Sequence, residues 1–129
     1  MNEPLTAVAL RPTTVKGEHM PAAVPDVISR YFDVTAERDT DAIVALFAND
    51  ATVVDEGTER RGRDQIRAWR NGPATAYTYT TELLRTETID PDRYLTTGRL
   101  TGNFPGSIAD LKWDFTIADG RITRLVIAP

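Results

Sequence analysis

The sequence contains no cysteine, so the chain cannot form disulfides, a thiolate zinc site or a cysteine nucleophile. It contains one histidine, His19, which cannot by itself form a histidine cluster around a metal ion. The sequence also has no glycine-rich phosphate loop, no serine-triad motif and no ligand set with metal spacing. We therefore expect the protein to work without a cofactor and without a metal.

The chain also lacks an excess of basic residues and any long hydrophobic run. It has 15 Lys and Arg against 19 Asp and Glu, which gives a net charge of −4. A general nucleic-acid-binding protein needs a basic surface, so we expect no nucleic-acid partner. No apolar run approaches the length that spans a membrane, and the N-terminus lacks the basic flank and apolar core of a signal peptide. We expect no membrane partner and a cytoplasmic location.

Residues 1–24 differ in composition from the rest of the chain. They include Pro4, Pro12 and Pro21 and show no helical period. A disordered tail and an arm that pairs with a sheet edge or a second subunit are both open at this point. The chain length and its hydrophobic content suit one domain with an ordinary core. The sequence therefore predicts an N-terminal arm or tail over 1–24 and a single domain over 25–129.

The first half of this domain has the spacing of helices. After Pro25, which suits a first helical turn, apolar residues recur every three or four positions. Asp39 or Thr40 can cap a second helix, whose apolar face continues through Phe47. The segment GRDQIRAWRNG, residues 62–72, predicts a third, short helix that ends at Asn-Gly. Between the second and third helices, Ala-Thr-Val-Val has the character of a buried strand and is followed by two acids and a glycine.

The second half of the domain alternates as β-strands do. Strands are predicted over 74–89, 93–104, 109–117 and 121–129, with turns between them. In residues 109–117, Leu, Trp, Phe and Ile alternate with polar residues, so one face is apolar. The order predicts an α+β fold, a cone-shaped barrel in which three N-terminal helices pack in a curved antiparallel β-sheet. Core side chains fill one end of such a cone, and the other end can remain open to a ligand.

Three stretches resemble a known family. ISRYFDVTAERDTDAIVALFANDATVVDEG is similar to its paired helices and first strand, GRDQIRAW to its short third helix, and FTIADGRITRLVIAP to its closing hairpin. On these motifs the chain resembles the nuclear-transport-factor-2-like superfamily, in its SnoaL-like and ketosteroid-isomerase-like branch. The resemblance covers most of residues 25–129. It implies the cone fold and a homodimer formed through the outer face of the sheet, but this scaffold hosts both enzymes and non-enzymes.

The resemblance also implies two catalytic residues. Asp55 matches the general-base aspartate of the isomerases, and Tyr31 matches the first-helix tyrosine that donates to the developing enolate oxygen. The second acid of those isomerases falls on Trp113, so this chain keeps the base and the tyrosine and lacks the second donor. Strand alternation predicts that the nearby acids, Asp110 and Asp114, face outward.

Large aromatic side chains are expected to line the open end of the cone. The pocket-lining residues that we predict are Phe32, Phe47, Trp69, Trp113 and Phe115. Two of them, Trp69 and Trp113, could form a flat apolar wall for a ring-shaped ligand. Tyr77 and Tyr79 share a strand face that is often at a dimer surface in this family, so we expect them in an interface.

Two functions remain open from the sequence. The first is a cofactor-independent isomerase, dehydratase or cyclase that acts by acid–base chemistry on a small apolar, carbonyl-bearing or polyketide-like molecule. The second is a non-catalytic small-molecule-binding or dimeric accessory protein. The enzyme hypothesis requires Asp55 and Tyr31 to share a cavity. A structural role would leave Asp55 at the surface and Tyr31 sealed in the core.

Overall fold

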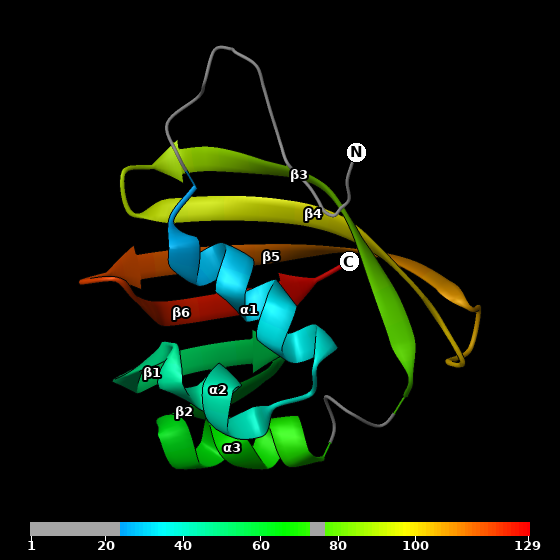
Figure 1. The fold of residues 1–129 in the computed structure, drawn as a ribbon, viewed down its shortest axis with the longest axis horizontal. Coiled ribbons are helices and arrows are strands. Elements are labelled where there is room, and N and C mark those ends of the chain that lie inside the picture. The colour runs from blue at the N-terminus through cyan, green and yellow to red at the C-terminus, as the bar shows by residue number, and fades with distance from the viewer. Residues whose placement is uncertain (1–23, 73–76) are drawn as a thin grey trace.

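The computed structural model describes residues 24–72 and 77–129, so the predicted arm over 1–24 lies, except for its last residue, outside the described residues. Figure 1 shows a curved sheet with α1 lying across it and with α2 and α3 near the β1–β2 edge. The elements in chain order are α1 (Asp26–Ala36), α2 (Thr40–Ala45), β1 (Phe47–Asp55), β2 (Thr58–Arg61), α3 (Arg63–Asn71), β3 (Tyr79–Asp90), β4 (Arg93–Gly102), β5 (Ile108–Ala118) and β6 (Arg121–Ala128).

The strands form one six-stranded sheet with the order β2-β1-β6-β5-β4-β3. Neighbouring strands are antiparallel except β1 and β6, which are parallel. The sheet is therefore mixed, where the sequence predicted an antiparallel one. The α+β class and the curvature of the sheet agree with the expected cone. The third helix follows the β1–β2 hairpin in the chain, so it does not form an uninterrupted N-terminal group with α1 and α2.

Local signals in the sequence explain where the first two helices begin. Asp26 lies in the first turn of α1, where the helix dipole favours an acid, and Tyr31 belongs to the buried face of this helix. The Asp39 side chain accepts a hydrogen bond from the Ala42 backbone N–H, so of the two candidate caps, Asp39 and Thr40, it is Asp39 that caps α2. These two helices cover part of the inner face of the sheet.

The predicted extension of the second helix through Phe47 is wrong. Helix α2 ends at Ala45, and Phe47 is the first residue of β1, paired with Ile122 of β6. The Leu46 carbonyl accepts a hydrogen bond from the Ile122 N–H at 2.9 Å. The backbone therefore leaves the helix to pair with a strand 75 positions later, although the apolar spacing of the sequence still fits a helix.

The charged residues after Gly57 form a strand that the sequence did not indicate. Asp55 pairs with Thr58 across a two-residue turn, in which Glu56 and Gly57 have φ of 54° and 75°. Positive φ at both central residues is typical of a tight hairpin turn. The turn ends β1 at Asp55, so the hairpin fixes the position of the Asp55 backbone.

The core lies between α1, α2, α3 and the inner face of the sheet. Alternation along β5 is as predicted, with Trp113, Phe115 and Ile117 buried. Gly98 of β4 lies beneath the Trp113 ring, and a Cβ at this position would come within 3.0 Å of that ring. The glycine therefore leaves room for the Trp113 ring against β4, where a larger residue would require the ring or the β3 backbone to shift by a few tenths of an ångström.

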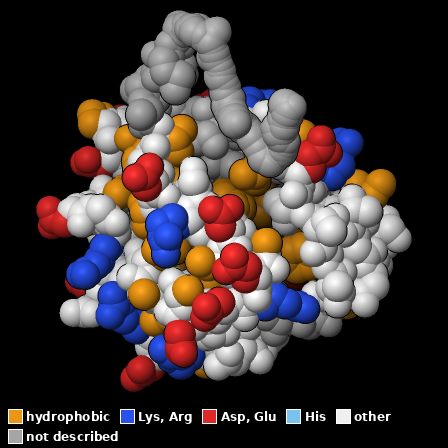
Figure 2. All heavy atoms as spheres, in the orientation of Figure 1, with side chains coloured by type: hydrophobic (Ala, Val, Ile, Leu, Met, Phe, Trp, Pro, Cys, Tyr) orange, Lys and Arg blue, Asp and Glu red, His pale blue; other side chains and the backbone are white. Residues whose placement is uncertain are grey.

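On the face that carries α1 and α2, acidic and basic side chains are both spread over the surface in Figure 2. Among residues 24–72 and 77–129, none of the helices combines the length and the apolar character that a bilayer crossing requires.

Candidate active site

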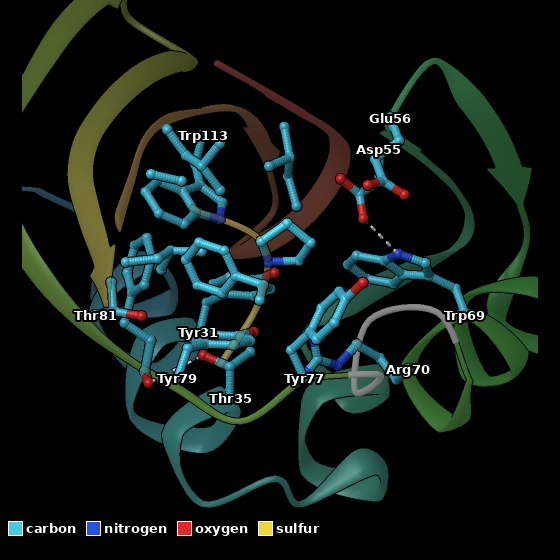
Figure 3. A pocket seen from close by; sticks show the side chains of 17 residues that line it. Tyr31, Thr35, Asp55, Glu56, Trp69, Arg70, Tyr77, Tyr79, Thr81 and Trp113 are labelled. Atoms are coloured by element: carbon cyan, nitrogen blue, oxygen red, sulfur yellow. Dashed lines mark hydrogen bonds between the residues drawn. The ribbon is translucent and has the colours of Figure 1, made fainter. Parts of the chain in front are cut away.

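A cavity of about 630 Å³ lies between the helices and the inner face of the sheet. Its walls come from α1, α3, the end of β1, and the strands β3 to β6 with the turn between β4 and β5 (Figure 3). Apolar and aromatic side chains make up most of the lining, and a few polar groups converge in it. The volume is in the range of small-molecule binding sites, so the open end of the cone can hold a ligand.

The β1–β2 hairpin places Asp55 in the wall of this cavity. Side chains alternate along a strand, so Asp55 lies on the same face of β1 as Ala51 and Val53, which are fully buried. Its neighbour across the parallel pair is Ile127, which in turn pairs with Trp113, and both also line the cavity. Asp55 is therefore half-buried on the core face of the sheet. A purely structural role would have left it at the surface, exposed to solvent.

A hydrogen bond from α3 orients the Asp55 carboxylate. The Trp69 Nε1–H donates to Asp55 Oδ2 at 2.9 Å, and Figure 3 shows this contact at the edge of the cavity. An indole is a neutral donor, so it fixes the carboxylate without supplying a proton or a compensating charge. The other oxygen, Oδ1, has no hydrogen-bond partner among the described residues. Trp69 therefore holds one oxygen and leaves the other available to a ligand.

Tyr31 reaches the same cavity from α1. Its side chain is 2% exposed and packs edge to face against Phe32 and Phe115, with ring centroids 5.2 and 5.4 Å apart. Burial raises the pKa of the Tyr31 phenol well above its usual value, the charge of Arg70 opposes this rise, and Tyr79 and Asp55 add to it. The phenol therefore stays protonated at neutral pH and acts as a hydrogen-bond donor. It makes no hydrogen bond to any described residue, so the donor is free.

The structure brings Asp55 and Tyr31 to one cavity, as the sequence predicted, although they lie on different elements. The predicted pocket-lining residues divide into two groups. Phe32, Trp69 and Trp113 line the cavity. Figure 3 shows the indoles of Trp69 and Trp113 on opposite sides of it, so they do not form a single wall.

The prediction that Phe47 and Phe115 line the cavity is corrected by the structure. Both side chains are fully buried in the core and are not among the cavity-lining residues. Phe115 packs against Tyr31, which itself lines the cavity, and Phe47 is also within ring contact of Tyr31 at 6.3 Å. These two phenylalanines therefore support Tyr31 from the core.

Tyr77 and Tyr79, which we expected in an interface, both line the cavity. Tyr77 precedes β3 and Tyr79 is its first residue, where the strand crosses the open end of the cone. Their alternation was read correctly, but the face that they share is the inner one.

The sequence analysis missed one polar cavity residue, Arg70. It lies in the last turn of α3, lines the cavity, and is only 3% exposed. Its guanidinium lies 5.2 Å from the ring centroid of Trp69, and its Nε has no hydrogen-bond partner. The signal was present, since Ile66, Trp69 and Arg70 are spaced i, i+3, i+4 and so share the buried face of a helix.

The carboxylates of the cavity wall are Asp55 and Glu56. Asp110 and Asp114 face outward, as predicted, and pair with Arg99 and Arg93. Within the described ranges, no cluster of three or more His, Cys, Asp or Glu side chains could hold a metal ion. The polar side chains that line the cavity are therefore two carboxylates, three phenols, two hydroxyls and one guanidinium: Asp55, Glu56, Tyr31, Tyr77, Tyr79, Thr35, Thr81 and Arg70.

Comparison with known proteins agrees with this architecture. No curated protein matches the chain. A solved structure of a candidate polyketide cyclase from Sinorhizobium meliloti is 42% identical, covering 81% of this chain and 95% of that one, with a TM-score of 0.76. A protein with a ketosteroid-isomerase-like fold from Catenulispora acidiphila, solved with trimethylamine, is 18% identical over 83% and 87% of the two chains, with a TM-score of 0.73.

A third structure is an epoxide hydrolase/cyclase-like enzyme with a role in pyran ring formation in the polyether salinomycin. It is 24% identical over 79% of this chain and 86% of its own, with a TM-score of 0.68. At such identities the second and third likenesses concern the fold alone. Residues 28–125, by contrast, match the SnoaL-like domain family directly. Since that match spans most of the domain, the chain belongs to the SnoaL-like domain family, within the nuclear-transport-factor-2-like superfamily that its motifs indicated.

Proposed function

We propose that the protein is a cofactor-independent acid–base enzyme of the cyclase, isomerase or dehydratase type. Its substrate is a small apolar molecule that carries a carbonyl group and binds in the cavity. The observation that carries this proposal is the shared cavity of Asp55 and Tyr31, in which an oriented carboxylate and a protonated phenol each have a free hydrogen-bonding position. The likeness to a candidate polyketide cyclase at 42% identity supports the same class of chemistry.

In the proposed reaction, Asp55 Oδ1 accepts a proton from the carbon next to the carbonyl group. The two electrons of that C–H bond move into the carbonyl, which becomes an enolate, and the Tyr31 phenol donates a hydrogen bond to the enolate oxygen. Asp55 then returns the proton to another carbon, to a hydroxyl group that departs as water, or to the alkoxide that forms when the enolate carbon attacks a second carbonyl. These three outcomes are isomerisation, dehydration and cyclisation, and all of them begin with the same proton transfer.

One observation favours the alternative, a pocket that binds a small molecule without chemistry. By the family resemblance, the second acid of the ketosteroid isomerases falls on Trp113 in this chain. An indole N–H is a weaker donor than a carboxylic acid, so the enolate would be less stabilised. Such a protein would bind cyclic ketones without exchanging their protons.

Hydrogen–deuterium exchange distinguishes the two functions. A panel of cyclic enones is incubated in D₂O with wild-type protein, and exchange at the carbon next to the carbonyl is followed by NMR. We expect catalysed exchange, and we expect Asp55→Asn to lower its rate by about 10²–10⁴-fold, the usual contribution of a general base. Equal rates for wild type and Asp55→Asn would remove the proposed role of Asp55.

Glu56→Gln is the matched control for this experiment. Glu56 is the adjacent carboxylate and also lines the cavity, but it lies in the hairpin turn with a positive φ. We expect this variant to retain the wild-type rate. If Glu56→Gln lost the exchange and Asp55→Asn kept it, the base would be Glu56 and the assignment of Asp55 would be wrong.

The family also supports two proposals about the assembly and location of the protein. We propose a homodimer through the outer face of the sheet. The edge strand β3 also carries three apolar residues, Leu83, Leu84 and Ile89, that are each between 44% and 47% exposed. The cytoplasmic location remains a prediction, as does the absence of nucleic-acid and membrane partners.

A further inference from the structure

Arg70 is a buried cation without a protein partner. Its side chain is 3% exposed, and its Nε is inaccessible to solvent and makes no hydrogen bond. No carboxylate among the described residues forms an ion pair with it. Among the described residues its aromatic contact is the face of the neighbouring Trp69 ring, whose centroid lies 5.2 Å from the guanidinium carbon. A contact of this kind compensates only a small part of the cost of burying a charge.

Five exposed arginines of the chain have carboxylate partners, although water already solvates them. Arg93 and Arg99 each make two hydrogen bonds to one aspartate on the outer face of the sheet. Arg67, one turn before Arg70 on the same helix, pairs with Asp41. Arg70 is buried and has no such partner among the described residues, so we expect its partner to come from the cavity.

The groups around Arg70 do not neutralise it. The Asp55 carboxylate is held by the Trp69 indole, and no contact joins it to Arg70. The charge of Arg70 acts on the pKa of the Tyr31 phenol, so the two groups are close, but the phenol itself is uncharged and cannot neutralise Arg70. Figure 3 shows Arg70 extending from α3 toward the side of the cavity where Tyr31 and Tyr79 lie. A negative charge bound there would have a cation on one side and a phenol donor nearby.

The shape of the guanidinium limits which anions fit. It is a planar fork of N–H groups that matches two oxygens in one plane, as in a carboxylate or in the enolate of a 1,3-dicarbonyl. The rest of the cavity is mainly apolar and has aromatic side chains on several sides, which suits a ring.

We infer that Arg70 is the anion-binding group of the cavity, and that its ligands are small apolar ring molecules carrying a carboxylate or an enolised 1,3-dicarbonyl. This inference deepens the proposed function by naming the substrate class, but it requires only binding. The anionic group pairs with Arg70, and this pairing anchors the apolar body in the space between Tyr31 and Asp55. Arg70 is a binding residue in this scheme, and Asp55 remains the base.

Titration calorimetry with matched probes tests the inference. The carboxylate probe is 2-naphthoate and its neutral control is 2-naphthamide. The enolate probe is dimedone at pH 7.5 and its neutral control is 3,3-dimethylcyclohexanone. We expect wild type to bind at least one anion about tenfold or more tightly than its neutral control, since a hydrogen bond to a charged group has this strength. The pair that shows the preference identifies the kind of anion.

Three variants connect the preference to Arg70. Arg70→Met is expected to remove the preference for the anion while retaining affinity for the neutral probe, which shows that the cavity is intact. Arg70→Lys, which keeps the charge and loses the fork, is expected to retain part of the preference. Arg67→Met removes a charge from the exposed face of the same helix and is expected to bind every probe as wild type does.

Three results would overturn the inference: equal affinity of wild type for both anions and their neutral controls, anion affinity unchanged by Arg70→Met, or no binding of any probe. Its failure is distinguishable from that of the proposed function. Catalysed exchange that depends on Asp55, without an anion preference, would refute only the role of Arg70. An anion preference that depends on Arg70, without catalysed exchange, would refute only the enzyme.

Discussion

The two faces of the curved sheet treat charged side chains differently. On the outer face, Arg93 and Arg99 are bound by Asp114 and Asp110, with N–O distances between 2.6 and 3.2 Å. On the cavity side, Arg70 has no such partner. The outer ion pairs lie in water, which screens them, so they add little to stability. A carboxylate partner for Arg70 would contribute more, because its guanidinium is buried in the cavity wall and water screens it less.

This difference indicates that the polar groups of the cavity are not arranged to stabilise the folded protein. Three of them have unused hydrogen-bonding capacity: one oxygen of Asp55, the phenol of Tyr31 and the guanidinium of Arg70. Each unmade hydrogen bond in a buried site costs free energy, which a ligand can recover on binding. The outer face has its pairs already made, so it offers a ligand little.

The largest expected effect on stability comes from Arg70→Met. Methionine fills the space of the aliphatic stem and removes the uncompensated charge. We expect the free energy of unfolding to rise by about 1–2 kcal/mol, because buried charges without partners are destabilising and the cavity admits some water. Urea denaturation of the ligand-free protein measures this change.

Arg67→Met is the control for that experiment, because it removes an exposed arginine from the same helix. We expect its free energy of unfolding to stay within about 0.5 kcal/mol of wild type. If Arg70→Met instead destabilised the protein by 1 kcal/mol or more, Arg70 would be a structural residue and the contrast between the two faces would disappear.

The sequence predicted the parts of the fold that local patterns determine. The strand alternation from Leu111 to Ile117, the cap at Asp39 and the hairpin turn before Arg121 depend on neighbours in sequence, and all three are observed. Phe47 was placed on a helix because its pairing partner, Ile122, is distant in the chain. Strand β2 is short and charged, and it is held in place by antiparallel pairing with β1, which local sequence patterns do not indicate.

The candidate site was predicted from the sequence in part. Asp55 and Tyr31 came from a family resemblance, which brought together two elements that local patterns cannot relate. The hydrogen bond from Trp69 to Asp55 depends on how α3 packs against β1, so an apolar role was the natural expectation for this tryptophan. Arg70 was within reach of sequence reasoning, because a cation one position after Trp69 falls on the buried face of an amphipathic helix.

The next effect in size concerns Tyr31 at alkaline pH. Its folded-state pKa is raised above the unfolded value of about 10, mainly by burial, so above pH 10 the folded state binds more protons than the unfolded state. The contribution of the Tyr31 phenol to the free energy of unfolding is therefore fully present below pH 10 and decreases as the pH rises further. We expect a loss of about 1 kcal/mol between pH 10 and pH 11 that Tyr31→Phe does not show. Denaturation curves at the two pH values measure it, and parallel decreases in wild type and variant would show that the phenol is not buried.

The smallest effect is expected on the outer face, from Asp110→Asn. Hydrogen bonds from Arg99 lower the pKa of Asp110, so its contribution is present above the unfolded pKa of about 4 and is lost as the pH falls through the folded value. Both side chains are about half exposed, and water and salt screen the pair. We expect a slightly lower thermal midpoint for the variant at pH 7, no difference at pH 2, and no difference at pH 7 in 1 M NaCl. A large decrease in the thermal midpoint that persists in high salt would mean that the outer ion pairs stabilise the sheet as strongly as buried ones do. Solvation would then not explain the difference between the two faces of the sheet.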